Sequence, residues 1–272
     1  MSGADHPADA AGARRSHRTA WLAVALVSGL LVAALSGADL VNRLMRQTYT
    51  GSAVYRNDIS ALSVDNDDGD ITVGTGRAGQ VTVGQRLDWN TVRPTVRVER
   101  SGGTLTVDVR CDGPLGDLGC HADLTILVPP QTRLTSVSES GAVTVRRLDG
   151  PLDLQSASGG IQLDGVGGPV RAVTSSGPID GGDLRSGQFT ARSSSGPVSV
   201  DFAAPPGQVS VSTDSGPVEV DLPQATRYRV TGSSGSGPRD VTAALADPTA
   251  PGLITADTGS GPVTIDYDQS GG

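Results

Sequence analysis

The sequence contains no lysine, few aromatic residues and only two cysteines. All 21 of its basic residues are arginine, and Phe, Trp and Tyr together make up 3% of its 272 residues. A globular core of this size normally takes much of its apolar surface from aromatic side chains. The shortage therefore disfavours a conventional core. The remaining apolar residues, mainly Val, Leu, Ile and Ala, suit a narrow β interior with many turns, and glycine is abundant, at 37 residues.

Acidic residues outnumber basic ones, and the formal net charge is -8. Three of the arginines, Arg14, Arg15 and Arg18, precede an apolar segment, so the rest of the chain is more acidic than the whole. An acidic surface repels phosphate, which argues against nucleic-acid binding. The same net charge argues against attachment to anionic lipid headgroups by charge.

Histidine is also scarce, and His121 is the only one beyond the apolar segment. A hydrolase triad needs an imidazole beside its nucleophile, and the sequence has no Gly-x-Ser-x-Gly elbow. Glycan-cleaving β-helices use carboxylates instead, and Asp201, Asp221 and Asp266 follow similar strand-like runs where they could form an acidic row. This chain, however, has few aromatic residues to offer as platforms for sugars. We therefore predict no catalytic residue and no enzyme activity.

The acidic run from Asp65 to Asp70 resembles a calcium loop only in composition. An EF-hand loop has Gly sixth and Glu twelfth, whereas here Gly69 is fifth and Gly76 twelfth, counted from Asp65. We interpret the run as a solvated β-turn, with weak surface binding of cations as the alternative. The sequence therefore predicts neither a metal site nor a cofactor.

Residues 19–38 form an apolar run without charge, and about 20 such residues span a bilayer as a helix. The arginines before it predict, by the positive-inside rule, a cytoplasmic tail over residues 1–18 and an extracytoplasmic location for everything after Asp39. A cleaved signal peptide is the alternative, because Ser36-Gly37-Ala38 resembles a cleavage site. Both interpretations predict export, and we expect a single-pass protein of the cell membrane. Residues 39–55 are predicted to be a juxtamembrane stalk, in which the helix continues until Gly51 ends it.

The two cysteines fit an oxidising compartment. Cys111 and Cys120 bracket a short loop that contains one proline and three glycines. At this spacing outside the cytoplasm, two cysteines are best interpreted as a disulfide that closes the loop. A metal site is the other possibility, but it lacks further ligands because His121 is the only available histidine.

The second half of the chain repeats one signal: Ser-Gly, often followed by Pro, and then an alternating apolar and polar run. The repeat glycines are 18 to 24 residues apart, a period typical of solenoids. Alternation with period two, as in Val198, Val200 and Phe202, predicts short strands, about two in each repeat. Stacked at about 4.8 Å per rung, seven repeats would make a rod of roughly 30 Å. The seven glycines are Gly141, Gly159, Gly177, Gly196, Gly216, Gly237 and Gly261.

We therefore predict an all-β fold: a parallel β-solenoid over residues 135–269, with an N-terminal β cap over residues 56–134, preceded by one transmembrane helix. A cap is expected because an open solenoid end exposes unpaired backbone. The serines of the turns are interpreted as architecture, since stacked hydroxyls can bond to turn backbone groups and to each other.

The Ser-Gly-x-Val repeats resemble the bacterial putative-adhesin family of β-strand repeats, over about Ile59 to Tyr267. The resemblance rests on DGDITV, on the paired cysteines before LTILVPP, and on the units SGPVSVD and SGPVEVD. One unit departs from the pattern, because Arg239 occupies a slot that is usually apolar. The family has no accepted catalytic residues. The resemblance implies a surface-interaction module whose partner is a cell-envelope protein or glycan. A role in envelope-stress sensing or scaffolding is the alternative, because some relatives act in such signalling.

Overall fold

A computed structural model describes residues 46–56, 58–112, 119–224 and 226–268, together with the isolated helical positions 24 and 28. Residues 47–272 form one compact unit, separate from residues 1–46. This unit is built from strands. They are β1 (Gln47–Arg56), β2 (Ala61–Asn66), β3 (Ile71–Thr75), β4 (Gln80–Trp89), β5 (Thr95–Ser101), β6 (Thr104–Arg110), β7 (His121–Val128), β8 (Arg133–Ser138), β9 (Val143–Arg146), β10 (Leu152–Ser156), β11 (Ile161–Asp164), β12 (Val170–Thr174), β13 (Ile179–Leu184), β14 (Gln188–Ser193), β15 (Val198–Phe202), β16 (Gln208–Thr213), β17 (Val218–Leu222), β18 (Arg229–Thr231), β19 (Arg239–Val241), β20 (Leu253–Thr258) and β21 (Val263–Tyr267).

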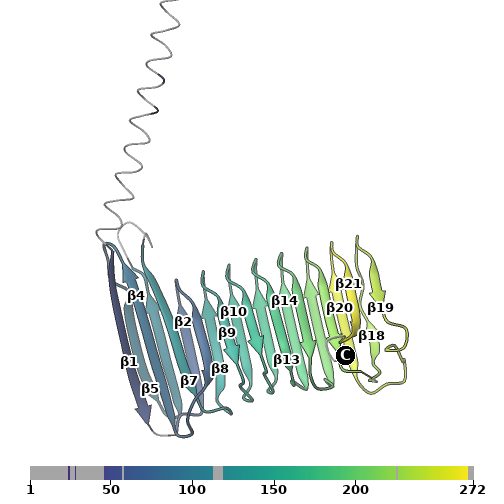
Figure 1. The fold of residues 1–272 in the computed structure, drawn as a ribbon, viewed down its shortest axis with the longest axis horizontal. Helices are drawn as coiled ribbons and strands as arrows, with labels where there is room; N and C mark the ends of the chain where they lie inside the picture. Colours follow the sequence, from purple (N-terminus) through teal and green to yellow (C-terminus); the bar gives the residue numbers. More distant parts are fainter. Residues whose placement is uncertain are drawn as a thin grey trace, which may run out of the picture. The chain divides into compact units, whose positions relative to one another are not determined.

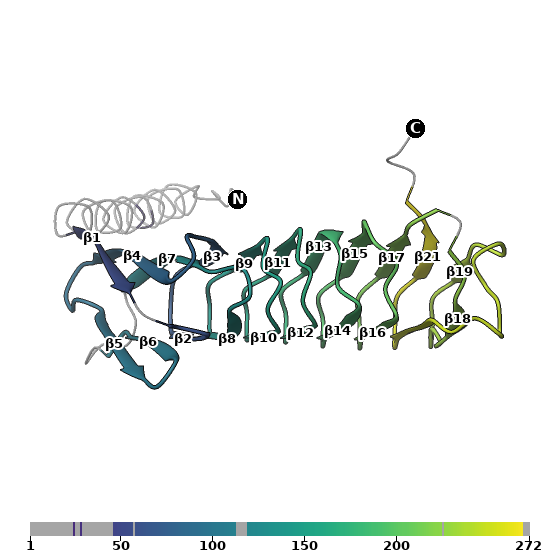
Figure 2. The same ribbon diagram turned by 90° about the horizontal axis from the view of Figure 1, so that it is seen from below.

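The strands form two sheets that face each other along the stack (Figures 1 and 2). Sheet A has eleven strands, in the order β1-β4-β7-β3-β9-β11-β13-β15-β17-β21-β19. Sheet B has ten, in the order β18-β20-β16-β14-β12-β10-β8-β2-β6-β5. Each rung gives one strand to each sheet, and successive rungs pair in parallel, as in Leu152↔Val170 between β10 and β12. The predicted all-β stack of short parallel strands is confirmed.

The core is a single apolar layer between the sheets. The predicted alternation holds: Val198, Val200 and Phe202 of β15 are buried, while the residues between them are partly exposed. Phe189 packs edge-on against Phe202, with ring centroids 5.7 Å apart. Because Val, Leu and Ile line most of this thin interior, the fold needs few aromatic residues.

Each repeat glycine lies directly against the backbone of the neighbouring rung. A Cβ added to Gly177 would lie 2.1 Å from the carbonyl oxygen of Gly159, and one added to Gly196 would lie 1.9 Å from that of Gly177. No residue with a Cβ fits there while the rungs keep their spacing. The same contact, at 1.8 to 2.3 Å, recurs at Gly141, Gly159, Gly177, Gly196, Gly216, Gly261 and Gly237, which we call the glycine ladder.

A hydroxyl stands three residues before each glycine of the ladder, and it is buried in all rungs but the last. Thr174 Oγ1 accepts a hydrogen bond from the N–H of Gly177 at 3.1 Å and donates one to the carbonyl of Gly159 at 3.3 Å. The serine directly before each glycine is exposed instead. The predicted bonding of turn hydroxyls to turn backbone therefore belongs to the earlier residue. This hydroxyl ladder comprises Ser138, Ser156, Thr174, Ser193, Thr213, Thr258 and Ser234.

The rungs do not follow the order of the chain at either end of the stack. β2 and β3 lie between β6/β7 on one side and β8/β9 on the other. β20 and β21 likewise lie between β16/β17 and β18/β19, so the repeat of Gly261 precedes that of Gly237 in space. β2 and β3 therefore belong to the parallel stack, although the sequence placed them in the cap, whereas β1, β4 and β5 form antiparallel pairs at the N-terminal end.

The predicted stalk over residues 39–55 is wrong in its last part. Gln47–Arg56 is strand β1, which pairs antiparallel with β4 along its whole length, for example Ala53↔Val83. Residues of this segment alternate between small and β-forming types, and pairing along β4 favours a strand over the predicted continuation of the helix. The cytoplasmic tail, the transmembrane helix over residues 19–38 and the rest of the stalk lie outside the described residues, apart from positions 24, 28 and 46. Within the part of the chain that is described, no helix is sufficiently long and apolar to cross a bilayer.

Candidate functional site

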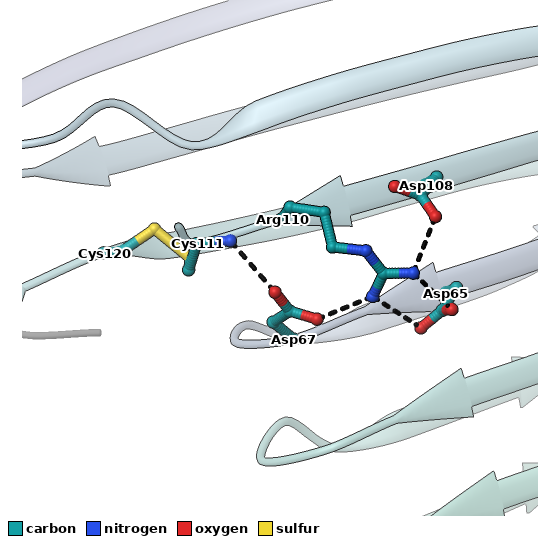
Figure 3. A network of polar contacts seen from close by, with 6 residues as sticks. All are labelled: Asp65, Asp67, Asp108, Arg110, Cys111 and Cys120. Carbon is teal, nitrogen blue, oxygen red and sulfur yellow. Dashed lines mark hydrogen bonds and ion pairs between the residues drawn. A yellow bond between two sulfur atoms is a disulfide. The ribbon is translucent and has the colours of Figure 1, made fainter. Parts of the chain in front are cut away.

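Arg110, at the end of β6, is the centre of a polar network near the N-terminal end of the stack (Figure 3). Its guanidinium donates hydrogen bonds to carboxylates from β2, from the turn after β2 and from β6. Nη2 lies 2.7 Å from Asp65 Oδ2 and 2.7 Å from Asp108 Oδ2, and Nη1 lies 2.7 Å from Asp67 Oδ1. Hydrogen bonds with Asp65 and Asp67 raise the pKa of Arg110. The arginine therefore holds β2, its turn and β6 together.

The network continues into the disulfide. The N–H of Cys111 donates to Asp67 Oδ2 at 3.0 Å, and Cys111 is bonded to Cys120 with a Cα–Cα distance of 5.9 Å (Figure 3). Both half-cystines are buried. The predicted disulfide is therefore present, and it ties the end of β6 to the start of β7, the two strands of one rung. Asp65 and Asp67, in the acidic run that resembled a calcium loop in composition, are therefore members of this network.

His121 lies between two carboxylates at the same end of the molecule. Its Nδ1 is 3.1 Å from Asp68 Oδ1, and its Nε2 is 3.0 Å from Asp123 Oδ1. A neutral imidazole donates through only one nitrogen, whereas the protonated ring donates through both. The ring thus links the turn after β2 to β7. Among the described residues, no group of three or more His, Cys, Asp or Glu is arranged to hold a metal ion.

The three aspartates that the sequence singled out do lie in one row. Asp201 pairs with Asp221, and Asp221 with Asp266, on the parallel strands β15, β17 and β21 of sheet A. Burial, followed by the charges of Glu219, Asp201, Asp266 and Asp268, raises the pKa of Asp221 to about 6. Burial and the charges of Asp268 and Asp183 raise the pKa of Asp201, although a backbone hydrogen bond opposes them.

The outer face of sheet A carries a longer polar row and a hollow. The row runs through the paired residues Thr144, Gln162, Asp180, Ser199, Glu219 and Thr264. At its centre Gly181 and Gly182 carry no side chains, and they help to line a hollow of about 390 Å³ together with Arg146, Asp164 and the first four residues of the row. Backbone, amide, guanidinium and carboxylate groups therefore converge on one open depression.

Sheet B presents a second polar row on the opposite face of the stack. Its members are Thr135, Asp153, Arg171, Thr190, Ser210 and Thr255. Parallel pairing without a register shift keeps these side chains in line. Sheet A differs, because β13 contains a register shift between Gly181 and Leu184. That irregularity is where the hollow lies, and nothing in the sequence distinguished Gly182 from the many other glycines.

Comparison with known proteins supports the architecture. The family model Toastrack DUF4097 matches residues 131–270, just over half of the chain. The chain belongs to this family. The resemblance to a bacterial family of β-strand repeats is thereby confirmed. No curated protein matches.

Solved structures are similar to the chain at low sequence identity, and one of them, with a TM-score above 0.5, shows the same fold. A protein from Parabacteroides distasonis described as a "putative lipid binding protein" is 15% identical, with a TM-score of 0.52 over 80% of this chain and 96% of its own. A "putative adhesin" from Bacteroides fragilis is 13% identical, with a TM-score of 0.47 over 81% of this chain and 97% of its own. A "putative cell adhesion protein" from Clostridium sporogenes is 10% identical, with a TM-score of 0.38 over 82% of this chain and all of its own.

Proposed function

We propose that this Toastrack chain is a membrane-anchored, extracytoplasmic and non-catalytic interaction module that binds a cell-envelope protein or glycan through the outer face of sheet A. The observation that carries the proposal is the polar row with its hollow at Gly181 and Gly182. A rigid parallel sheet holds these groups in fixed positions, so little conformational entropy is lost on binding. The apolar run at residues 19–38 and the disulfide support an exported, anchored protein.

Filling the hollow tests the proposed face. A Cβ at Gly182 or at Gly187 meets nothing within 4 Å, so a larger side chain can start at both positions without a clash. The full-length chain, purified in detergent under oxidising conditions, would be incubated with isolated cell-wall material and with detergent-extracted envelope proteins. We expect saturable binding that Gly182→Leu abolishes and that Gly187→Leu, outside the hollow, leaves intact. Equal binding by both variants would contradict the assignment of the face.

The same material separates the other functional classes. Glycan cleavage that is lost in Asp201→Asn or Asp221→Asn would show a hydrolase, contrary to the proposal. Absence of any partner would favour the sensing or scaffolding role instead. In that case removal of residues 2–13, which lie in the predicted cytoplasmic tail, should abolish the response to envelope stress.

A further inference from the structure

The N-terminal end of the stack has a different charge from the rest of the unit. In β1, β4, β5 and the β4–β5 loop, residues 47–56 and 80–101, five arginines stand against two acidic residues. Residues 133–268 hold nine arginines and fifteen acidic residues. The net acidity of the chain therefore conceals a basic end.

Exposed apolar side chains gather at the same end. Five large hydrophobic residues of the described part of residues 47–268 are exposed. Four of them, Tyr49, Val54, Val92 and Leu127, belong to β1, the β4–β5 loop and β7, and the fifth is Val137. Most of the exposed large apolar residues therefore lie in elements at or next to the basic end, with Tyr49 and Val54 on opposite faces of β1.

Aromatic rings and arginine are also paired here. The guanidinium of Arg93 lies 4.5 Å from the ring centroid of Tyr49 and 5.3 Å from that of Trp89. Tyr, Trp and Arg combine an apolar body with a polar tip, which suits the boundary between lipid headgroups and acyl chains.

One strand at the N-terminal end of the stack, β1, has no partner strand in the facing sheet, so its side chains on that side are accessible. Sheet A has eleven strands and sheet B ten. Sheet B ends at β5, so no strand of sheet B lies opposite β1 (Figure 2). The side of β1 that continues the core carries Tyr49, Ala53 and Tyr55, whose partners in β4 are Leu87, Val83 and Val81. Tyr49 is 41% exposed.

We propose that this basic end, formed by β1, β4, β5 and residues 90–94, rests on a bilayer surface that contains anionic lipid headgroups. The inference rests on the membrane anchor proposed above. Only residues 39–46 separate the apolar run from β1, and eight extended residues reach at most about 29 Å. The arginines complement the negative charge of the lipid phosphates. With the eleven strands of sheet A spaced at about 4.8 Å, the far end of the stack would stand roughly 50 Å from the bilayer.

Fluorescence of Trp89 in the full-length chain tests the contact. Trp21→Phe leaves Trp89 as the only tryptophan. This protein would be reconstituted into phosphatidylcholine vesicles with and without phosphatidylglycerol, and quenching by acrylamide would be measured at low and high salt. We expect quenching to be about twofold weaker with the anionic lipid, and high salt to remove the difference because it screens exposed charges.

Two matched triple variants locate the effect. Substitution of Arg56, Arg97 and Arg100 by Gln should restore quenching to its level in neutral vesicles. Substitution of three exposed arginines of sheet B by Gln, which removes the same charge, should leave the difference unchanged; these are Arg133, Arg171 and Arg192.

Other outcomes overturn the proposal. Equal quenching in both lipids, or equal effects of the two triple variants, would show that the basic end makes no specific contact with anionic lipid. Shielding of Trp89 that grows with protein density in neutral vesicles would show that a second copy covers this end. Flotation with neutral vesicles at high salt tests the anchor separately, so failure of the anchor and failure of the contact are distinguishable.

Discussion

The glycine ladder makes a sharp prediction about stability. In Gly177→Ala the added methyl group would lie 2.1 Å from the carbonyl oxygen and 2.4 Å from the carbonyl carbon of Gly159, both of them backbone atoms. Relief of this overlap requires the two rungs to separate by more than about 1 Å, because ordinary carbon contacts begin near 3.5 Å. Overpacking of a core costs about 1–3 kcal/mol, and we expect the upper end because no side chain can move aside.

A loss of about 3 kcal/mol would lower the Tm by roughly 6–12 °C, since 1 kcal/mol corresponds to about 2–4 °C for a unit of this size. Gly182→Ala is the matched control, because its Cβ meets nothing within 4 Å. It should be neutral or stabilise by up to about 1 kcal/mol through the unfolded state. Circular dichroism melts and urea titrations of both variants measure the difference. If Gly177→Ala lost no more stability than Gly182→Ala, the reasoning about rung spacing would be refuted.

Three further predictions concern the hydroxyl ladder, the disulfide and the acidic row. Thr174→Val should cost about 1–3 kcal/mol in urea titrations, because it leaves the N–H of Gly177 buried without its partner. Replacement of Cys111 and Cys120 by Ala should lower stability by about 2–3 kcal/mol and make the melting temperature insensitive to reductant. Asp221→Asn should raise stability at pH 8 by less than about 1 kcal/mol, because solvent partly screens this half-buried carboxylate, and should have a much smaller effect at pH 4.

The sign of the last prediction follows from proton binding. The folded chain holds the proton of Asp221 up to about pH 6, above the ordinary value of 3.8. The folded state therefore binds more protons than the unfolded one between these values, and stability falls as the pH rises through this window. Asparagine is uncharged throughout and avoids the loss. A stabilising effect of equal size at pH 4 would contradict the assignment to this carboxyl.

Matched controls keep the other two predictions specific. Thr190→Val changes the same residue type on the outer face of sheet B and should alter stability by less than about 0.5 kcal/mol. For the disulfide, wild type with reductant should melt at the temperature of the double alanine variant. A double variant as stable as oxidised wild type would show that the network around Arg110 holds this rung without the covalent bond.

Local patterns predicted the repeated part of the fold well. Strict alternation such as Val198, Val200 and Phe202 identifies buried faces directly, and the spacing of the repeat glycines identifies the stack. The β1 strand was missed because the predicted helix was continued from the apolar run as far as Gly51, and only pairing with β4 reveals the strand. The hollow at Gly182 depends on a register shift in β13, which is a property of three-dimensional pairing.

The basic end could have been predicted from the sequence, but the net charge of the whole chain gave no indication of it. The formal charge of -8 describes the whole chain, whereas binding depends on charge that is gathered on one surface. Residues 80–101 contain four arginines, Arg86, Arg93, Arg97 and Arg100, against two acidic residues. Counting charge by segment would have weakened the argument against contact with anionic lipids.

The order of the rungs at the C-terminal end also explains the one repeat that departs from the sequence pattern. Arg239 occupies a position that is apolar in the other repeats, and its partner in β21 is the buried Val263. β19 is the last strand of sheet A, so no further rung covers this position and Arg239 is exposed. An apolar residue here would extend the core to an open edge and invite another chain to pair with it. The repeat that departs from the pattern is therefore the one that ends the stack, although another repeat follows it in the chain.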